Sequence, residues 1–95
     1  MRKIHSLNKI ENDCIVIFSA KHCAPCGPVK RAINNVATVP VYLVDVDDDE
    51  KLAISEGVMG LPTVRYYKGG LVIDEWSGSK TDRKITKEIC GLYKE

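Results

Sequence analysis

Two cysteines, Cys23 and Cys26, are the residues of this chain best suited to do chemistry. They lie in the segment AKHCAPC at residues 20–26, directly after the apolar run IVIF at residues 15–18. The apolar run predicts a buried strand, and the Cys-x-x-Cys stands at its exit, where a helix would begin. Free backbone N–H groups at a helix N-terminus stabilise negative charge, so a cysteine there forms its reactive thiolate more readily. The spacing therefore indicates thiol redox chemistry or metal binding.

Length and charge limit what kind of protein carries this pair. The 95 residues suffice for a single domain, residues 1–95, with one core. With 14 basic and 13 acidic residues in mixed order, the net charge is +1, which gives no broad basic field for nucleic acid. The basic start at residues 1–3 is not followed by an apolar stretch, and no run approaches the roughly 20 apolar residues of a membrane span. We expect a soluble, cytoplasmic monomer without nucleic-acid or membrane partners.

The other two cysteines, Cys14 and Cys90, need a separate explanation. Four cysteines in a short secreted chain suggest a disulfide framework, but no signal peptide is apparent here. Because unpaired cysteine is often buried, both are expected to be small core hydrophobes. A dimer linked through Cys90 is the alternative.

The elements that position the pair follow from periodicity. Apolar residues recur at helical spacing from Cys26 to Ala37, and Pro40 ends this helix before the apolar run 41–46, which gives a β–α–β pattern. Gly69 and Gly70 supply the positive φ of a tight hairpin. The other expected elements are a short strand at 2–7, at most two helical turns at 7–12, strands at 14–19, 63–67 and 71–76, and helices at 50–56 and from residue 80. Together they predict an α/β fold whose central mixed sheet has helices on both faces.

The acidic run at residues 45–50 is expected to be structural. Asp48 or Asp49 is placed to cap the helix at 50–56, with Gly57 just after it. A metal site is the alternative, but adjacent carboxylates at a strand end usually meet solvent and a helix dipole.

Several motifs stand in the order and spacing found in thioredoxins. They are Phe18-Ser19-Ala20 with Cys23-Ala24-Pro25-Cys26, then Val44-Asp45-Val46-Asp47, Gly60-Leu61-Pro62-Thr63, Tyr67-Lys68-Gly69-Gly70 and Gly78. Through them the chain resembles the thioredoxin family over almost its whole length. The resemblance implies a thioredoxin fold, with Cys23 as nucleophile, Cys26 as resolving thiol and Pro62 in a cis peptide bond beside them. Glutaredoxins place the threonine before the proline, so the order Pro62-Thr63 favours protein over glutathione as thiol partner.

The same resemblance implies the activity and partners. It implies a thiol–disulfide oxidoreductase that reduces disulfides of client proteins without a cofactor and is recharged by a thioredoxin-reductase-type donor. A cis proline lacks an N–H and leaves neighbouring backbone groups free to pair with an extended client. Without the two cysteines, Pro62 would be better explained as a turn residue. The residues expected to contact the client are His22, Ala24, Pro25, Gly60, Leu61, Pro62 and Gly78.

The chain also departs from the family pattern. Ile17 and Leu43 stand where many thioredoxins carry a buried aspartate and its lysine neighbour, so we expect Cys26 to deprotonate through water and resolution to be slower. His22 replaces a tryptophan, and we consider three roles for it: a positive charge near Cys23, a proton carrier, or a side chain without catalytic weight. The remaining departures are Ala24 for glycine, Gly27-Pro28 after the second cysteine, and Arg31 for a helix-bending proline.

Two other functions stay open. Cys23 and Cys26 could form half of a tetrahedral thiolate site for a metal or an iron–sulfur cluster. A second close pair is absent from the sequence, so such a site would need His5, Cys14 and Cys90 to converge or a second copy of the chain. The other possibility is a redox-inactive docking module of the same fold.

Overall fold

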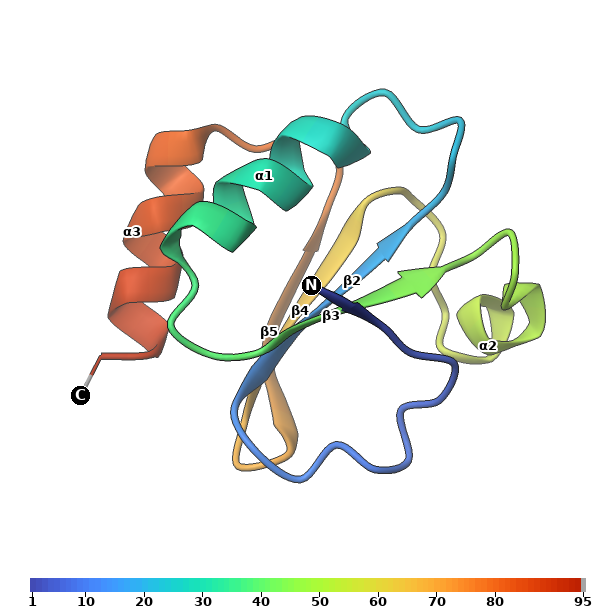
Figure 1. Ribbon diagram of the computed structural model, residues 1–95, viewed down its shortest axis with the longest axis horizontal. Coiled ribbons are helices and arrows are strands. Elements are labelled where there is room, and N and C mark those ends of the chain that lie inside the picture. The colour runs from blue at the N-terminus through green and yellow to red at the C-terminus, as the bar shows by residue number, and fades with distance from the viewer. Residues whose placement is uncertain (95) are drawn as a thin grey trace.

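The computed structural model describes residues 1–94, which form a five-stranded mixed sheet and three helices (Figure 1). The strand order is β1-β3-β2-β4-β5, with β1 and β2 parallel to β3, and with β4 antiparallel to both β2 and β5. The elements are β1 (Arg2–Lys3), β2 (Cys14–Ser19), α1 (Cys26–Val36), β3 (Val41–Asp45), α2 (Glu50–Ser55), β4 (Thr63–Lys68), β5 (Leu71–Ser77) and α3 (Asp82–Leu92).

Strand β2 is the centre of the sheet, and all six of its residues are buried. Because side chains alternate along a strand, β2 serves two cores. Ile15 and Ile17 face α1 and α3, which lie together on one side of the sheet in Figure 1. Val16 and Phe18 face the other side, where α2 and the N-terminal segment cover the sheet. The predicted α/β architecture, with helices on both faces, is confirmed.

The N-terminal segment differs from the prediction. The strand expected at residues 2–7 is limited to Arg2–Lys3, and no helix forms at residues 7–12, where a single turn is closed by the Ile10 N–H donating to the Leu7 carbonyl at 3.3 Å. Ile4, Leu7 and Ile10 instead pack on the second core as an irregular strap.

The acidic run does not cap α2 through a side chain, in contrast to the prediction. Asp49 occupies the N-cap position of α2 but makes no capping hydrogen bond. Its carboxylate lies 2.7 Å from His5 Nδ1, and Asp48 accepts from Lys3 Nζ at 3.0 Å. The two carboxylates therefore bind the N-terminal segment to the β3–α2 loop.

The two cysteines outside the Cys-x-x-Cys lie in opposite environments. Cys14 is 3% exposed, which confirms it as a core residue. Cys90 is exposed, so its expected burial is wrong. The inward face of α3 carries Ile85 and Ile89, and the next residue along a helix points about 100° away from that face.

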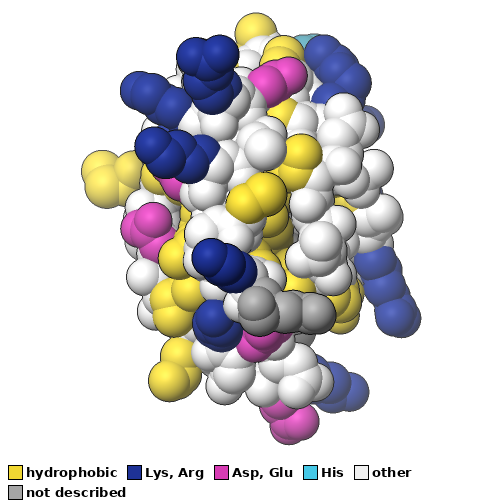
Figure 2. Space-filling view, turned by 90° about the vertical axis from the view of Figure 1, so that its left-hand side faces the viewer, with side chains coloured by type: hydrophobic (Ala, Val, Ile, Leu, Met, Phe, Trp, Pro, Cys, Tyr) yellow, Lys and Arg dark blue, Asp and Glu magenta, His cyan; other side chains and the backbone are white. Residues whose placement is uncertain are grey.

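Thr81 is the N-cap of α3 and accepts from the Lys84 N–H at 3.3 Å. On the side seen in Figure 2, several Lys and Arg side chains gather toward the upper left, and the others are separated by apolar, acidic and uncharged surface. None of the helices in this described range is long and apolar enough to cross a membrane.

Candidate active site

Cys23 and Cys26 are joined by a disulfide at the beginning of α1. The S–S distance is 2.13 Å and the two Cα atoms are 5.4 Å apart. Cys26 is the first residue of α1, and its N–H donates to the Cys23 carbonyl at 3.2 Å. Cys26 is 1% exposed whereas Cys23 is only half-buried, so a partner molecule can approach Cys23 far more easily.

The N-terminus of α1 favours negative charge beside this disulfide. Pro25 is the N-cap residue and provides no side-chain cap, and the first turn holds no acidic residue. Pro28 is tolerated there because first-turn N–H groups lack intrahelical partners. Arg31 folds back along the helix, with its Nη1 atom 3.5 Å from where a Cβ on Gly27 would lie. The helix dipole and this guanidinium both place positive charge at the first turn.

The Leu61–Pro62 peptide bond is cis, as the family resemblance implied. The Pro62 carbonyl accepts from the Gly78 N–H at 2.9 Å. Thr63 Oγ1 donates to the Gly60 carbonyl at 2.6 Å and lies 2.8 Å from Ser77 Oγ. These hydrogen bonds bring residues 60–63 and 77–78 together.

The sheet register brings this cis-proline loop to the same end of the molecule as the cysteines. Phe18, close to the end of β2, lies opposite Thr63 at the start of β4. The segment 20–25, which leaves β2, and the segment 60–62, which enters β4, therefore lie at one end of the sheet (Figure 1).

The predicted client-contacting residues differ in accessibility. His22 and Ala24 are exposed on the segment between β2 and α1, and Pro25 is half-buried. Gly60, Leu61 and Gly78 are half-buried at the cis-proline loop and the end of β5, and Pro62 is buried.

The position of the family's buried acid is apolar in this chain. Ile17 and Leu43 lie opposite each other on the parallel strands β2 and β3. Ile17 is fully buried in the core under α1, and Leu43 packs against that core. Neither side chain can take up a proton from Cys26.

Sequence analysis missed a contact between Asp47 and the segment that carries Cys23. Its Oδ2 accepts from the Lys21 N–H at 3.1 Å, two residues before Cys23. The adjacent Val46 N–H donates to the Ser19 carbonyl at 2.9 Å. Asp47 belongs both to the acidic run, whose expected role is structural, and to the segment 44–47 that carries the family resemblance. That second observation was the signal for a role near the cysteines.

Comparison with known proteins decides the family. The family model described as Thioredoxin matches residues 4–90. This chain belongs to the thioredoxin family. Thioredoxin of Equus caballus is 33% identical over 92 residues, a match that covers 92% of this chain and 87% of that protein. Mitochondrial thioredoxin of Mus musculus is 35% identical over 80 residues, which cover 79% of this chain and 48% of that protein.

Solved thioredoxin structures share the fold. A mutant thioredoxin from Halobacterium salinarum NRC-1 superposes with a TM-score of 0.84 at 22% identity, covering 99% of this chain and 90% of that chain. Oxidised thioredoxin O2 from Arabidopsis thaliana gives a TM-score of 0.82 at 23% identity, and the match covers 98% of this chain and 94% of that chain. The predicted thioredoxin fold is therefore confirmed.

Family membership and the Cys23–Cys26 disulfide together establish the reaction class. The chain is a thiol–disulfide oxidoreductase that acts on disulfide substrates. Among residues 1–94, no group of three or more His, Cys, Asp or Glu side chains is arranged to hold a metal ion. The described part of the chain thus offers no intrachain donor set for the metal alternative.

Proposed function

We propose that this thioredoxin-family chain reduces disulfides of client proteins, with Cys23 as nucleophile and Cys26 as resolving thiol. The observation that carries the proposal is the disulfide at the start of α1, with Cys26 buried and Cys23 accessible. In the reduced chain, the Cys23 thiolate attacks one client sulfur, a Cys23–client disulfide forms and the other client sulfur leaves as a thiolate. The Cys26 thiolate then attacks Cys23 Sγ, which restores the 23–26 disulfide and releases the second client thiolate.

Activation of Cys23 needs more than the helix dipole. A helix terminus contributes about 0.3 to 1 kcal/mol, equivalent to less than about one pH unit of thiol ionisation. Hydrogen bonds from backbone N–H groups at the first turn, together with the Arg31 guanidinium over Gly27, supply further stabilisation of the thiolate.

The client would dock along the cis-proline loop. The carbonyls of Gly60 and Pro62 accept hydrogen bonds within the chain, whereas the Leu61 backbone makes none within residues 1–94. A free amide and carbonyl on one residue suit pairing with an extended client. The exposed His22 and Ala24 would border the client on the other side of the disulfide.

Deprotonation of Cys26 would proceed through water, because Ile17 and Leu43 provide no base.

Electrons would come from a thioredoxin-reductase-type donor. Consistent with this, the chain is 27% identical over 80 residues to NADPH-dependent thioredoxin reductase 3 of Arabidopsis thaliana, covering 79% of this chain and 15% of that protein. We place the protein in the cytoplasm as a monomer on the basis of its composition.

Trapping the mixed disulfide tests the assignment of the two cysteines. Cys26→Ser, incubated with a peptide that contains one disulfide, should retain the peptide covalently on Cys23, because no resolving thiol remains. Cys23→Ser should retain none, and both variants should reduce the peptide at less than about one-thousandth of the native rate. Mass spectrometry of the intact protein and its fragments identifies the adduct. Cys90→Ser, which removes the other exposed thiol, serves as control and should behave like the native chain. Equal trapping by Cys23→Ser would overturn the assignment.

A further inference from the structure

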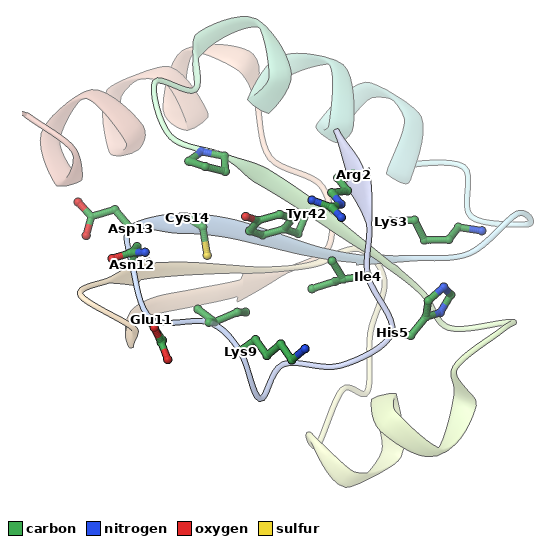
Figure 3. A pocket seen from close by; sticks show the side chains of 12 residues that line it. Arg2, Lys3, Ile4, His5, Lys9, Glu11, Asn12, Asp13, Cys14 and Tyr42 are labelled. Atoms are coloured by element: carbon green, nitrogen blue, oxygen red, sulfur yellow. The ribbon is translucent and has the colours of Figure 1, made fainter.

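A half-open cavity of about 390 Å³ lies between the N-terminal segment and the sheet (Figure 3). Residues from β1, from the segment 4–13 and from the beginnings of β2 and β3 line it. Its size is within the range of small-molecule pockets, about 300 to 1,000 Å³. None of the residues assigned to the disulfide chemistry lines it, so binding in this cavity would be independent of the proposed function.

Apolar side chains form one part of the cavity lining. Ile4, Ile10 and Tyr42 are half-buried and pack on the core that the strap covers. Cys14 lies among them and is buried. Figure 3 shows Ile4 and Tyr42 between the N-terminal segment and the sheet, where a ligand would contact them. A flat apolar group would gain free energy by covering these side chains.

The acidic residues of the lining are directed elsewhere. Asp13 accepts from the Gly69 N–H at 2.8 Å, so its carboxylate is held by the β4–β5 hairpin. In Figure 3 the Glu11 side chain points away from the centre of the cavity. Neither carboxylate faces a molecule bound in the cavity.

Two of the three Lys and Arg side chains at the cavity make no ion pair within residues 1–94. Lys3 pairs with Asp48, and His5 lies against Asp49. Arg2 and Lys9 make no ion pair within residues 1–94. Arg2 stands opposite Tyr42 in the β1–β3 register, and both residues line the cavity. The cavity thus combines apolar side chains with two unpaired positive charges.

We propose that this cavity binds a small organic anion, with an apolar body against Ile4, Ile10 and Tyr42 and an acidic group bound by either Arg2 or Lys9, which stand on opposite sides of Ile4 in Figure 3. Charge-assisted hydrogen bonds from a guanidinium and an ammonium suit a carboxylate, sulfonate or phosphate oxygen. An aromatic body of the ligand would stack on the Tyr42 ring, which lines the cavity.

The test uses 8-anilinonaphthalene-1-sulfonate, whose fluorescence rises in apolar sites, and the oxidised native chain. We expect saturable binding of one molecule per chain, with backbone NMR shifts that change most at Ile4, Ile10 and Tyr42. The double variant Arg2→Gln, Lys9→Gln should weaken binding at least about tenfold. Peptide-disulfide reduction should be unchanged in this variant, because neither residue belongs to the redox site.

Two controls distinguish binding in this cavity from non-specific binding of the dye elsewhere on the surface. Arg83→Gln, Lys84→Gln removes the same charge from the exposed face of α3 and should change affinity by less than about twofold, because distant charges are screened. N-phenyl-1-naphthylamine lacks the sulfonate and should bind the native chain at least about tenfold more weakly. The proposal is overturned by a lack of saturable binding, by shifts centred on the exposed Ile54 and Met59, by equal binding of the neutral analogue, or by equal weakening in both double variants.

Discussion

At the scale of single residues, the environments of the cysteines decide which thiols react. Cys14 lies at the start of the buried strand β2, and burial, assisted by the nearby Asp13 carboxylate, raises its pKa from about 9 to about 11. Cys90 lies on the outer face of α3. Since the thiolate is the reactive species, these two free thiols should differ strongly although both lie outside the redox pair.

Alkylation measures this difference directly. With the 23–26 disulfide intact, iodoacetamide at pH 8 should modify Cys90 and leave Cys14 unmodified in the folded chain, whereas both should react in urea. Mass spectrometry counts and locates the added groups. Modification of Cys14 at a rate similar to that of Cys90, without unfolding, would contradict the burial of Cys14.

The raised pKa of Cys14 also predicts an alkaline loss of stability. Above about pH 9 the unfolded chain loses the Cys14 proton while the folded chain keeps it, so the free energy of unfolding falls until the pH passes about 11. Burial raises the pKa values of Tyr66 and Tyr93 as well, which contributes in the same direction. Cys14→Ala should therefore make the fall between pH 8 and 11 smaller by about 2 kcal/mol. Urea titrations of the oxidised chain measure it, and Cys90→Ala should retain the full fall.

At the scale of elements, the β3–α2 loop fixes the segment that carries Cys23. Asp47 accepts the Lys21 N–H, and its own N–H donates to Asp45 Oδ1 at 2.9 Å. Asp47→Ala removes the first of these bonds, so the rate of peptide-disulfide reduction should fall by about three- to tenfold as the cysteine segment loses its position. Asp47→Asn keeps an acceptor oxygen and should restore most of the rate. If both variants reduce the peptide at the native rate, Asp47 does not position this segment.

A buried cation joins α2 to the hairpin. Arg65 on β4 bonds Glu75 on β5, the Glu56 carboxylate and the Glu56 carbonyl, and its guanidinium lies 5.1 Å from the centre of the Phe18 ring. Its side chain is 9% exposed.

Replacing this cation tests the connection. Arg65→Met keeps the volume but leaves the Glu56 carbonyl without its partner, so the free energy of unfolding should fall by about 2 to 3 kcal/mol. Arg83→Met on the exposed face of α3 is the matched control and should change it by less than about 0.5 kcal/mol. Equal effects of the two substitutions, measured in urea, would show that the Arg65 contacts contribute little.

At the scale of the whole molecule, local patterns predicted most of the fold. The buried run that became β2, the helical period of α1 and the paired glycines at residues 69–70 each specify their element from nearby residues. The cysteine pair was equally recognisable because its chemistry depends on a spacing of three residues.

What sequence reasoning missed depends on partners distant in the chain. Asp48 and Asp49 make no capping hydrogen bond to α2. Their carboxylates instead bind Lys3 and His5, which are more than 40 residues away in the sequence. The path of residues 4–13 likewise follows from the sheet face that they cover. Cys90 is a different case. The helical period of Ile85 and Ile89 predicts that Cys90 lies on the solvent-facing side of α3, and the expectation that it is buried rested on its residue type alone.

The central claim is that Cys23 and Cys26 form a reducing dithiol. Its most direct test is the redox equilibrium of this pair in thiol–disulfide buffers, read by mass after alkylation, with Cys23→Ser as control. The account predicts a reversible 23–26 disulfide with a potential near about −270 mV, the value of a thioredoxin-type reductant. A potential of about −120 to −180 mV would contradict the reducing direction, and failure to form the disulfide would contradict the claim altogether.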